Sequence, residues 1–278
     1  MSFLGLSVGL SHLRLQLAAR DQLALKSERP KRVRRPRLVS HLGRWGRARR
    51  WLPPDARYGV DVGCAFGYGT AAMTGHGYRT KCIIGVERDP EHLEQATRLY
   101  PWVPVVRADA AALPFATAAV DAVIMLDVVE HVADAHAVLA EARRVLRDGG
   151  SLVMSVPNSG LLASLDPYNA YTALRRRWRS WPPLVSYDES ATGTHRHFSL
   201  EEARDLLGPG FSIDRVARTG TGVSELLDLL LTIVFFALLG CQRAYPRLRF
   251  LHFLAYVVDD LVPVGPSGYH LTLRARAV

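Results

Sequence analysis

Between about residues 56 and 158 the chain alternates short apolar runs with helical stretches, and this alternation limits the fold more than any other feature of the sequence. The expected strands cover 58–63, 81–87, 103–107, 121–126 and 151–156, and the expected helices cover 91–100 and 134–146. Strands that are apolar throughout are typical of a parallel sheet with helices on both faces. Residues 211–216 and 269–275 would supply two further strands, so we expect an α/β fold.

A glycine-rich loop follows the first expected strand, from Asp61 to Gly69. Glycines let the backbone turn sharply and approach a ligand closely, although such a loop by itself also fits dinucleotide-binding proteins. The next strand ends in Glu87, about 20 residues after Gly67, where a carboxylate can accept hydrogen bonds from both hydroxyls of a ribose. Asp109 follows the third strand, where a short acid can accept a hydrogen bond from an adenine amino group.

Further motifs follow in a fixed order: Leu113-Pro-Phe115, Leu126-Asp-Val-Val-Glu130-His131, Val145-Leu-Arg-Asp-Gly-Gly150 and, later, a run from Thr194 to Glu202. Over about residues 56–160 this series closely resembles the class I S-adenosylmethionine (SAM)-dependent methyltransferases of the ubiquinone/menaquinone-type small-molecule group. The resemblance implies a Rossmann-like, seven-stranded, mostly parallel sheet with helices on both faces. It also implies SAM as the methyl donor.

The resemblance further implies which residues contact the donor. Glu87 and Asp109 would bind its ribose and adenine, and Asp61, Gly63 and Gly67 would surround its methionine part. The complete expected set adds their neighbours Cys64, Ala65, Arg88, Ala110 and Leu126. Ala65 departs from the family pattern, which usually has a second glycine there. We expect this alanine to be tolerated because a negative φ would cost it little.

A sulfonium methyl group is already activated, so the protein mainly has to align the acceptor, which can lower a barrier by about 7–11 kcal/mol. A base is needed only where the acceptor loses a proton. His131, just after the fourth strand, is our candidate base, with a packing role as the alternative. Substrate contacts are expected from Tyr168, Tyr171, His195 and His197. No metal site is expected, because the three cysteines are far apart and make no zinc spacing.

The predicted organisation is a basic N-terminal extension (1–50) and a methyltransferase domain (51–278) with three parts: a SAM-binding half (51–160), a substrate-roof insertion (161–198) and an apolar helical hairpin (222–262) between the last strands. The first apolar run of the hairpin, from Leu226 to Leu239, would extend about 21 Å as a helix, short of a hydrocarbon core of roughly 30 Å. The hairpin would then dip into a membrane interface, line a pocket, or pack on the sheet or a second chain.

The leading expectation is methyl transfer to a small or lipidic acceptor at oxygen or carbon, in the cytoplasm. The net charge of +9 leaves an RNA-directed methyltransferase as an alternative. That alternative is disfavoured because no Asn/Asp-Pro-Pro-aromatic motif follows the fourth strand. A non-catalytic, membrane-associated methyltransferase-like partner is the third. We expect no secretory signal, and we leave open a peripheral contact with the inner membrane face and a homodimer.

Overall fold

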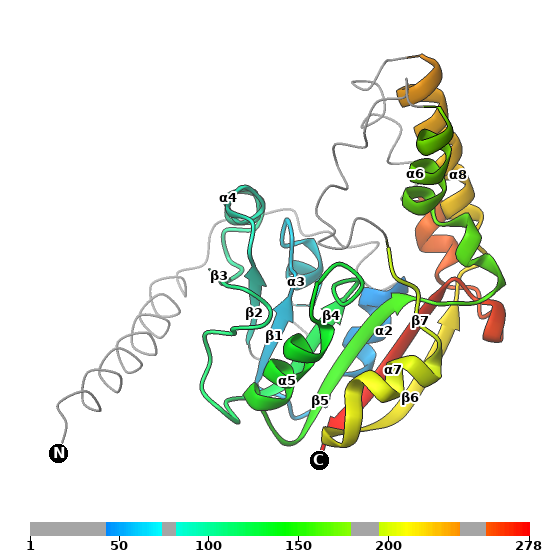
Figure 1. Cartoon of the computed structure of the whole chain (residues 1–278). Helices are drawn as coiled ribbons and strands as arrows, with labels where there is room; N and C mark the ends of the chain where they lie inside the picture. Colours follow the sequence, from blue (N-terminus) through cyan, green and yellow to red (C-terminus); the bar gives the residue numbers. More distant parts are fainter. Residues whose placement is uncertain (1–42, 74–81, 179–194, 240–253) are drawn as a thin grey trace, which may run out of the picture.

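A seven-stranded sheet organises the computed structural model, which describes residues 43–73, 82–178, 195–239 and 254–278. The strand order is β3-β2-β1-β4-β5-β7-β6 (Figure 1). Strands β1 to β5 are parallel, and β7 is antiparallel to both β5 and β6. The expected Rossmann-like sheet is therefore confirmed. The strands are β1 Tyr58–Val62, β2 Cys82–Glu87, β3 Val105–Arg107, β4 Val120–Leu126, β5 Leu146–Pro157, β6 Phe211–Thr219 and β7 His270–Ala277.

The strand order reverses at β1, which pairs with β2 on one side and β4 on the other. Chain segments leaving β1 and β4 therefore diverge over opposite halves of the sheet. In open α/β sheets this point, beyond the carboxyl ends of the strands, is where ligands bind. The loops after β1, β2, β3 and β4 all start at this edge.

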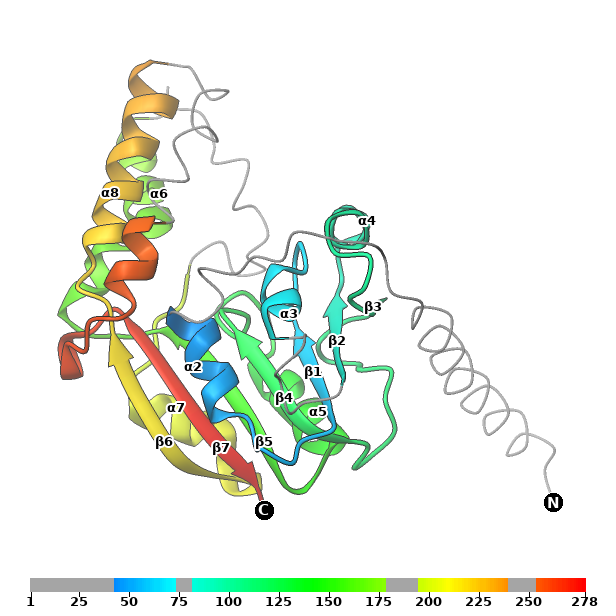
Figure 2. The same ribbon diagram turned by 180° about the vertical axis from the view of Figure 1, so that it is seen from behind.

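Helices cover both faces of the sheet because the central strands are apolar on both sides. Helices α5 (Ala135–Val145) and α7 (Leu200–Leu207) cover one face, and α2 (Gly43–Trp51) and α3 (Tyr68–Met73) cover the other (Figures 1 and 2). Alternate residues of β4 serve the two cores: Val123 and Met125 pack towards α5, whereas Ala122 and Ile124 pack towards α2. Helix α4 (Pro90–Leu99) lies beside β2 and β3.

The helix starts follow local capping rules. Asp89 caps α4 by accepting hydrogen bonds from the backbone N–H groups of Glu91 and His92, and Pro90 occupies the first turn. Asp134 caps α5 in the same way. Ser199 and Glu202 form the capping box at the start of α7 that the Ser-Leu-Glu-Glu sequence predicts.

Two boundaries differ from the sequence expectation. Strand β5 begins at Leu146 rather than 151, because Leu146 pairs with Val120 before a bulge and the strand continues through Gly149 at φ +72°. The basic segment expected to end at residue 50 includes most of α2, whose Arg44 and Arg47 are buried. These two arginines therefore lie inside the molecule and are not part of a basic surface.

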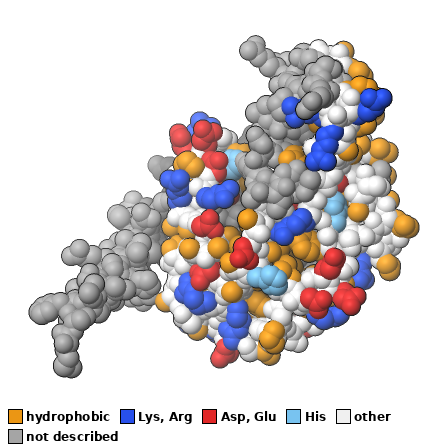
Figure 3. Space-filling model, in the orientation of Figure 1, with side chains coloured by type: hydrophobic (Ala, Val, Ile, Leu, Met, Phe, Trp, Pro, Cys, Tyr) orange, Lys and Arg blue, Asp and Glu red, His pale blue; other side chains and the backbone are white. Residues whose placement is uncertain are grey.

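Two helices form an arm that rises from the carboxyl edge of the parallel strands (Figures 1 and 2). The arm consists of α6 (Pro167–Arg177), reached through a 3-10 turn (Leu161–Leu165), and α8 (Val223–Thr232), continued by a π-helix (Ile233–Leu238). Tyr171 of α6 packs against Leu229, Leu231, Ile233 and Phe235 of the other helix. Hydrophobic and basic side chains share the surface of the arm (Figure 3).

The region expected to be an apolar hairpin is helical at both of its described ends, in α8 and at residues 254–259. The turn of that hairpin, and Cys241 with it, lies outside the described residues, as do residues 1–42 of the predicted extension and 179–194 of the predicted roof. Within the described residues no helix has the length and apolar character needed to span a bilayer. Short 3-10 turns at Gly208–Gly210 and Gly265–Ser267 precede β6 and β7.

Candidate functional site

The loop after β1 makes a tight turn at the switch point of the sheet. Gly63 and Gly67 have φ values of +71° and +76°, in the left-handed region that favours glycine. A Cβ on Gly63 would lie 2.6 Å from a methyl carbon of Val128, so no side chain fits there. The loop is anchored by the Gly63 and Cys64 N–H groups, which both donate to the carbonyl of Val86. The turn is therefore fixed against β2 and leaves Gly63 exposed.

Glu87, the last residue of β2, is held by three backbone donors. Its Oε2 accepts from Ala65 N at 3.0 Å, and its Oε1 accepts from Arg88 N at 2.7 Å and Asp89 N at 2.9 Å. Each carboxylate oxygen can accept more than one hydrogen bond. Glu87 thus fixes the glycine loop and still presents acceptor capacity at the sheet edge, where the sequence predicted a ribose-binding acid.

The condition under which alanine would cost little at position 65, a negative φ, is not met. The φ of Ala65 is +44°, a left-handed conformation that costs a residue with a Cβ roughly 1–2 kcal/mol. The hydrogen bond from Ala65 N to Glu87 holds this geometry in place. The position that usually carries glycine in similar proteins therefore keeps its glycine-type backbone here, under strain.

Asp61 lies beneath the loop and is 4% exposed. The Thr70 hydroxyl at the start of α3 donates to Asp61 Oδ2 at 2.6 Å. Burial raises the pKa of Asp61 to about 7, although the hydrogen bond from Thr70 lowers it. A positively charged group placed beside Asp61 would restore the ionised carboxylate.

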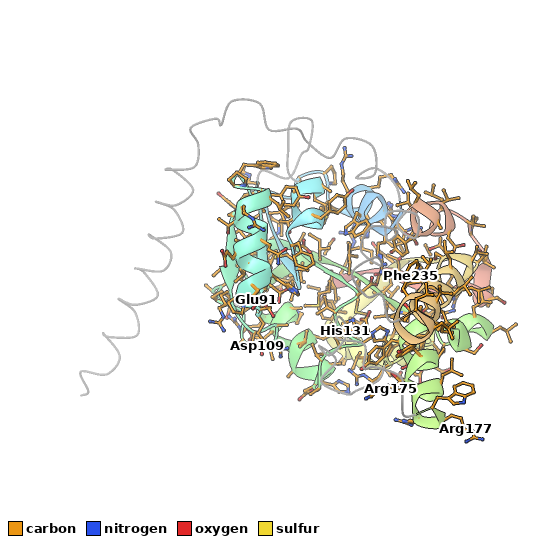
Figure 4. The ribbon with its side chains drawn as sticks, turned by 90° about the horizontal axis from the view of Figure 1, so that it is seen from above. Glu91, Asp109, His131, Arg175, Arg177 and Phe235 are labelled. Carbon is orange, nitrogen blue, oxygen red and sulfur yellow. The ribbon has the colours of Figure 1, made fainter. Side chains whose placement is uncertain are left out.

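The remaining predicted cofactor residues line the same edge. Asp109 is exposed after β3, and its Oδ1 accepts from Ala111 N at 2.8 Å. Ala110, next to Asp109 in the sequence, and Leu126, the last residue of β4, are both half-buried. Arg88 is exposed and contributes through its backbone, whereas Cys64 is buried, its thiol pKa raised by burial. In Figure 4, Asp109 and Glu91 lie on one side of His131, and the arm lies on the other.

A second polar cluster gathers around Asp166, the residue that caps α6. His195 Nδ1 lies 3.1 Å from Asp166 Oδ2, and the Tyr269 hydroxyl donates to the same oxygen at 3.0 Å. His197 Nε2 is 3.5 Å away. Burial acts to raise the pKa of Asp166, but the hydrogen bond and charge of His195 outweigh it, so this pKa lies below its usual range. Asp166 is therefore an ionised partner for histidine.

Backbone contacts fix His195 beside the end of β4. Asn169 of α6 exchanges two hydrogen bonds with the backbone of His195, at 2.8 and 3.0 Å. Arg196 donates to the carbonyls of Val129 and Val132 on either side of His131. As a result the His131 and His195 rings meet edge to face with centroids 4.8 Å apart.

The environment of His131 makes it a weak base. Burial, followed by the charge of His195, lowers the pKa of His131 to about 4. Its Nε2 lies 3.9 Å from Glu130, whose own pKa is raised well above the usual range by burial. The predicted base is therefore neutral at neutral pH, and it lies beside a histidine that has a carboxylate partner.

The two predicted tyrosines separate. Tyr168 stacks on the His195 ring with centroids 4.7 Å apart and belongs to the histidine cluster. Tyr171 is 1% exposed and packs inside the arm. The structure thus groups Tyr168, His131, His195 and His197, and assigns Tyr171 to helix packing.

Sequence reasoning missed the residues that support this cluster. Asp166 carries only a local signal, since Asp-Pro is a common helix start. Nothing near Tyr269 in the sequence indicates its contact with Asp166, 103 positions away. Arg44 pairs with Asp127 beyond the end of β4, and Ser155 donates to the same carboxylate at 2.7 Å. The sequence pattern assigned Arg44 only to the basic N-terminal extension.

The chain is similar to known methyltransferases. Residues 60–154 match the sequence model of a family described as methyltransferase domain. The chain is 35% identical over 103 residues to a probable S-adenosylmethionine-dependent methyltransferase of Mycobacterium tuberculosis, covering 37% of this chain and 36% of that protein. It is 41% identical over 105 residues to an uncharacterized methyltransferase of Mycobacterium leprae, covering 37% and 38%. The matches therefore span little more than a third of these relatives.

Solved structures share the fold over most of the chain. A SAM-dependent methyltransferase of Thermotoga maritima, described as a possible histamine N-methyltransferase, superposes with a TM-score of 0.55 at 21% identity, covering 86% of this chain and 91% of that one. A SAM-dependent methyltransferase of Mesorhizobium loti superposes with a TM-score of 0.53 at 17% identity, covering 86% and 99%. At these identities the likeness shows the fold alone.

Proposed function

Because the chain carries a class I S-adenosylmethionine-dependent methyltransferase domain, we propose that it transfers a methyl group from SAM to a hydroxyl group of a small or lipidic acceptor. The observation that carries the methyl-transfer part is the fixed Glu87 carboxylate beside the Gly63–Gly67 turn. The observation that carries the hydroxyl part is the Asp166–His195 pair at the end of β4.

The residues at the sheet edge fit SAM. Glu87 offers two carboxylate oxygens to a ribose diol in an orientation set by three backbone N–H groups. Asp61 is a buried acid whose pKa of about 7 shows that its negative charge is under-compensated, and an amino-acid ammonium group would supply that compensation. The exposed Gly63 lets a ligand approach the backbone where a Cβ would not fit. Asp109 follows β3 on the side expected for adenine.

On the acceptor side we assign the base to His195 and a supporting role to His131. Bound SAM supplies an already activated methyl group, so this chain has to orient the acceptor and remove one proton. Asp166 holds His195 through Nδ1, which directs Nε2 to receive the proton and stabilises the imidazolium that forms. His131, with its pKa near 4, packs against that ring. Asp166 is therefore a positioning residue.

Aromatic rings around this pair favour an acceptor with an apolar body. Tyr168 stacks on His195, and Tyr269 lies within 6.0 Å of the His197 ring, centroid to centroid. The arm with its exposed leucines rises from the same edge of the sheet (Figure 1). Both features support a hydrophobic substituent next to the methylated hydroxyl.

Titration calorimetry with S-adenosylhomocysteine tests the donor site without requiring the acceptor. We expect one binding site per chain, and no heat of binding would contradict the proposal. The acceptor is then sought by mass spectrometry, with isotope-labelled SAM and fractionated lipid and small-molecule extracts. Labelled products methylated only at nitrogen would contradict a hydroxyl acceptor.

Asp166→Asn tests the assignment of the base. With the labelled acceptor, we expect kcat to fall by about ten- to a hundredfold and the pH–rate profile to shift, because a general base contributes roughly 10²–10⁴-fold. Binding of S-adenosylhomocysteine should not change. His131→Ala is the comparison, and a larger kcat loss in that variant, without a change in pH profile for Asp166→Asn, would return the base to His131.

A further inference from the structure

The exposed charges of the arm all have one sign. Arg175, Arg176 and Arg177 form the last turn of α6 and are exposed, and Arg177 points outward at the margin of the molecule in Figure 4. Within the described part of the arm the acidic residues are Asp166, Glu225 and Asp228, and all three are buried. The arm therefore presents a positive surface with no exposed acid among its described residues.

Apolar side chains are exposed along α8, the other helix of the arm. Val223, Leu226 and Leu230 recur at spacings of three and four residues, so they lie on one face of α8. Further exposed apolar side chains lie within residues 254–262 and at the end of each arm helix. The exposed set is Trp178, Val223, Leu226, Leu230, Leu238, Leu239, Leu254, Val258, Leu261 and Val262. A row of exposed apolar side chains on one helix face, such as Val223, Leu226 and Leu230, is typical of an interaction surface.

Both arm helices run away from the sheet, so their last residues lie together at the end of the arm that is farthest from the sheet (Figures 1 and 2). Trp178 and the three arginines end α6, and Leu238 and Leu239, which are 68% and 61% exposed, end the described part of α8. This end of the arm thus combines cationic, aromatic and aliphatic side chains. The buried acids lie on the helices at or near their first turns, close to the sheet.

We propose that the arm is a docking surface for an anionic lipid bilayer, with the Leu226 and Leu230 face in the interfacial region and Arg175–Arg177 on lipid phosphates. The arm brings together residue types that are favoured at membrane interfaces, with tryptophan and arginine at the end of α6 and leucine on α8. In this proposal the arm lies on the bilayer surface, because its described helical residues from Val223 to Leu238 span about 24 Å, less than the roughly 30 Å hydrocarbon core.

Charge and exposed apolar side chains together favour a bilayer over two other partners, a second copy of this chain and an RNA strand. A second copy packed parallel on the arm would bring two arginine triplets together, and one packed antiparallel would leave both triplets without an anionic partner. An RNA strand would match the arginines but leave the row of exposed aliphatic side chains unpartnered, since bases stack on aromatic rings. A bilayer with anionic headgroups satisfies both the charge and the apolar stripe.

The test is flotation of the full chain with vesicles of phosphatidylcholine containing phosphatidylglycerol, and with vesicles of phosphatidylcholine alone, at low and high salt. Two variants address the two components: Arg175→Gln/Arg176→Gln/Arg177→Gln and Leu226→Ser/Leu230→Ser. Control variants outside the arm remove the same number of charges, as Arg98→Gln/Arg204→Gln/Arg215→Gln, and one similarly exposed leucine, as Leu99→Ser. All these positions are exposed, and circular dichroism checks that each variant is folded.

We expect binding to phosphatidylglycerol vesicles that weakens at high salt and drops on the order of a hundredfold in the arginine variant, since each basic residue near an anionic surface contributes a severalfold factor. The control triplet should bind within a few fold of the wild type. Equal losses in both triplets would show that net charge alone attracts the chain. No flotation, tighter binding to single-stranded RNA, or a dimer that the leucine variant dissociates in ultracentrifugation would each overturn the proposal.

Discussion

At the scale of single residues, the candidate donor site depends on Glu87 more than on any other side chain. Its carboxylate fixes the backbone of the glycine loop through Ala65 and the start of the α4 segment through Arg88 and Asp89. The same group is the proposed ribose ligand, so it links loop geometry to binding. Ala65 keeps a strained φ of +44° only because the loop around it is fixed.

Replacing Glu87 with glutamine should weaken SAM binding about ten- to a hundredfold. The amide keeps the size of the side chain but loses the charge that strengthens each hydrogen bond, at about 1.5–3 kcal/mol for a bond to a charged group. Calorimetry with S-adenosylhomocysteine measures the change. Glu94→Gln, an exposed position on α4, is the control. Unchanged affinity in Glu87→Gln would remove Glu87 from the site.

Replacing Ala65 with glycine should stabilise the protein by about 0.5–1 kcal/mol. The positive φ strains alanine, and relief of that strain exceeds the extra freedom glycine gains in the unfolded chain. Urea denaturation measures the difference. Ala111→Gly serves as the control, because Ala111 is exposed and has no positive φ, so it should be neutral or slightly destabilising. Equal effects at the two positions would contradict strain at Ala65.

At the scale of elements, the base of the arm is held by a capping interaction from a distant part of the chain. The N-cap of α8 is Gly222, which has φ +79° and no side chain. Asp259 supplies the capping acceptor instead. Its carboxylate accepts hydrogen bonds from Thr221 N at 2.7 Å, Gly222 N at 3.1 Å and the Ser224 hydroxyl at 3.0 Å. A negative charge at this end also interacts favourably with the helix dipole.

Asp259→Ala should destabilise the protein by about 2–4 kcal/mol, because several buried donors lose their acceptor together. Hydrogen exchange should become faster first in α8. Ser199→Ala is a matched change at an ordinary N-cap on α7 and should cost about 1 kcal/mol. Denaturation experiments compare the two variants, and a larger loss for Ser199→Ala would refute the role given to Asp259.

At the scale of the whole molecule, a layer of buried titratable groups lies between the sheet, α2 and the arm. Arg47 donates to the Thr272 hydroxyl and the Asp260 carbonyl, and Glu225 lies 3.7 Å from His270. Burial, together with the charge of Asp228, raises the pKa of Glu225 to about 8. Burial also moves the pKa of His270 well below its usual range, so both groups are neutral near pH 7.

This arrangement predicts that stability falls as pH rises from 6.5 to 8.5. Glu225 is ionised in the unfolded chain throughout this range but keeps its proton in the folded protein up to about pH 8, so the free energy of unfolding falls with rising pH until about pH 8 and levels off above it. The change is on the order of 2 kcal/mol. His131, whose pKa is lowered to about 4, acts in the opposite direction only below about pH 6.5.

Urea denaturation at pH 6.5, 7.5 and 8.5 measures this dependence. Glu225→Gln should make the decline smaller, since glutamine cannot ionise, and the remaining decline comes from other buried acids with raised pKa values, such as Asp61 and Glu130. The exposed control Glu201→Gln should keep the slope of the wild type. Stability that rises over this range in the wild type would contradict the protonated state of Glu225.

The donor half of the site and the α/β sheet follow from sequence because their determinants are local. Glu87 and Asp109 each lie directly after a strand, and parallel strands bring their carboxyl ends to one edge. The apolar runs of β1, β4 and β5 have no polar face, which requires covering on both sides. The solved structures confirm the fold, and residues 60–154 match the methyltransferase domain family. The individual site residues stay predictions.

The acceptor half was decided by tertiary structure, because its partners are far apart in the chain. Asp166, His195 and Tyr269 meet only when α6, the segment before α7 and β7 assemble, and no local pattern records that contact. Arg44 is a second example: its place in a basic segment does not indicate burial, but in the folded protein it is buried and forms an ion pair with Asp127. Burial then lowers the pKa of His131, whereas His195 lies within hydrogen-bonding distance of the Asp166 carboxylate. Sequence fixes which side chains follow each strand, whereas long-range packing decides which of them share a charge and how far water is excluded from them.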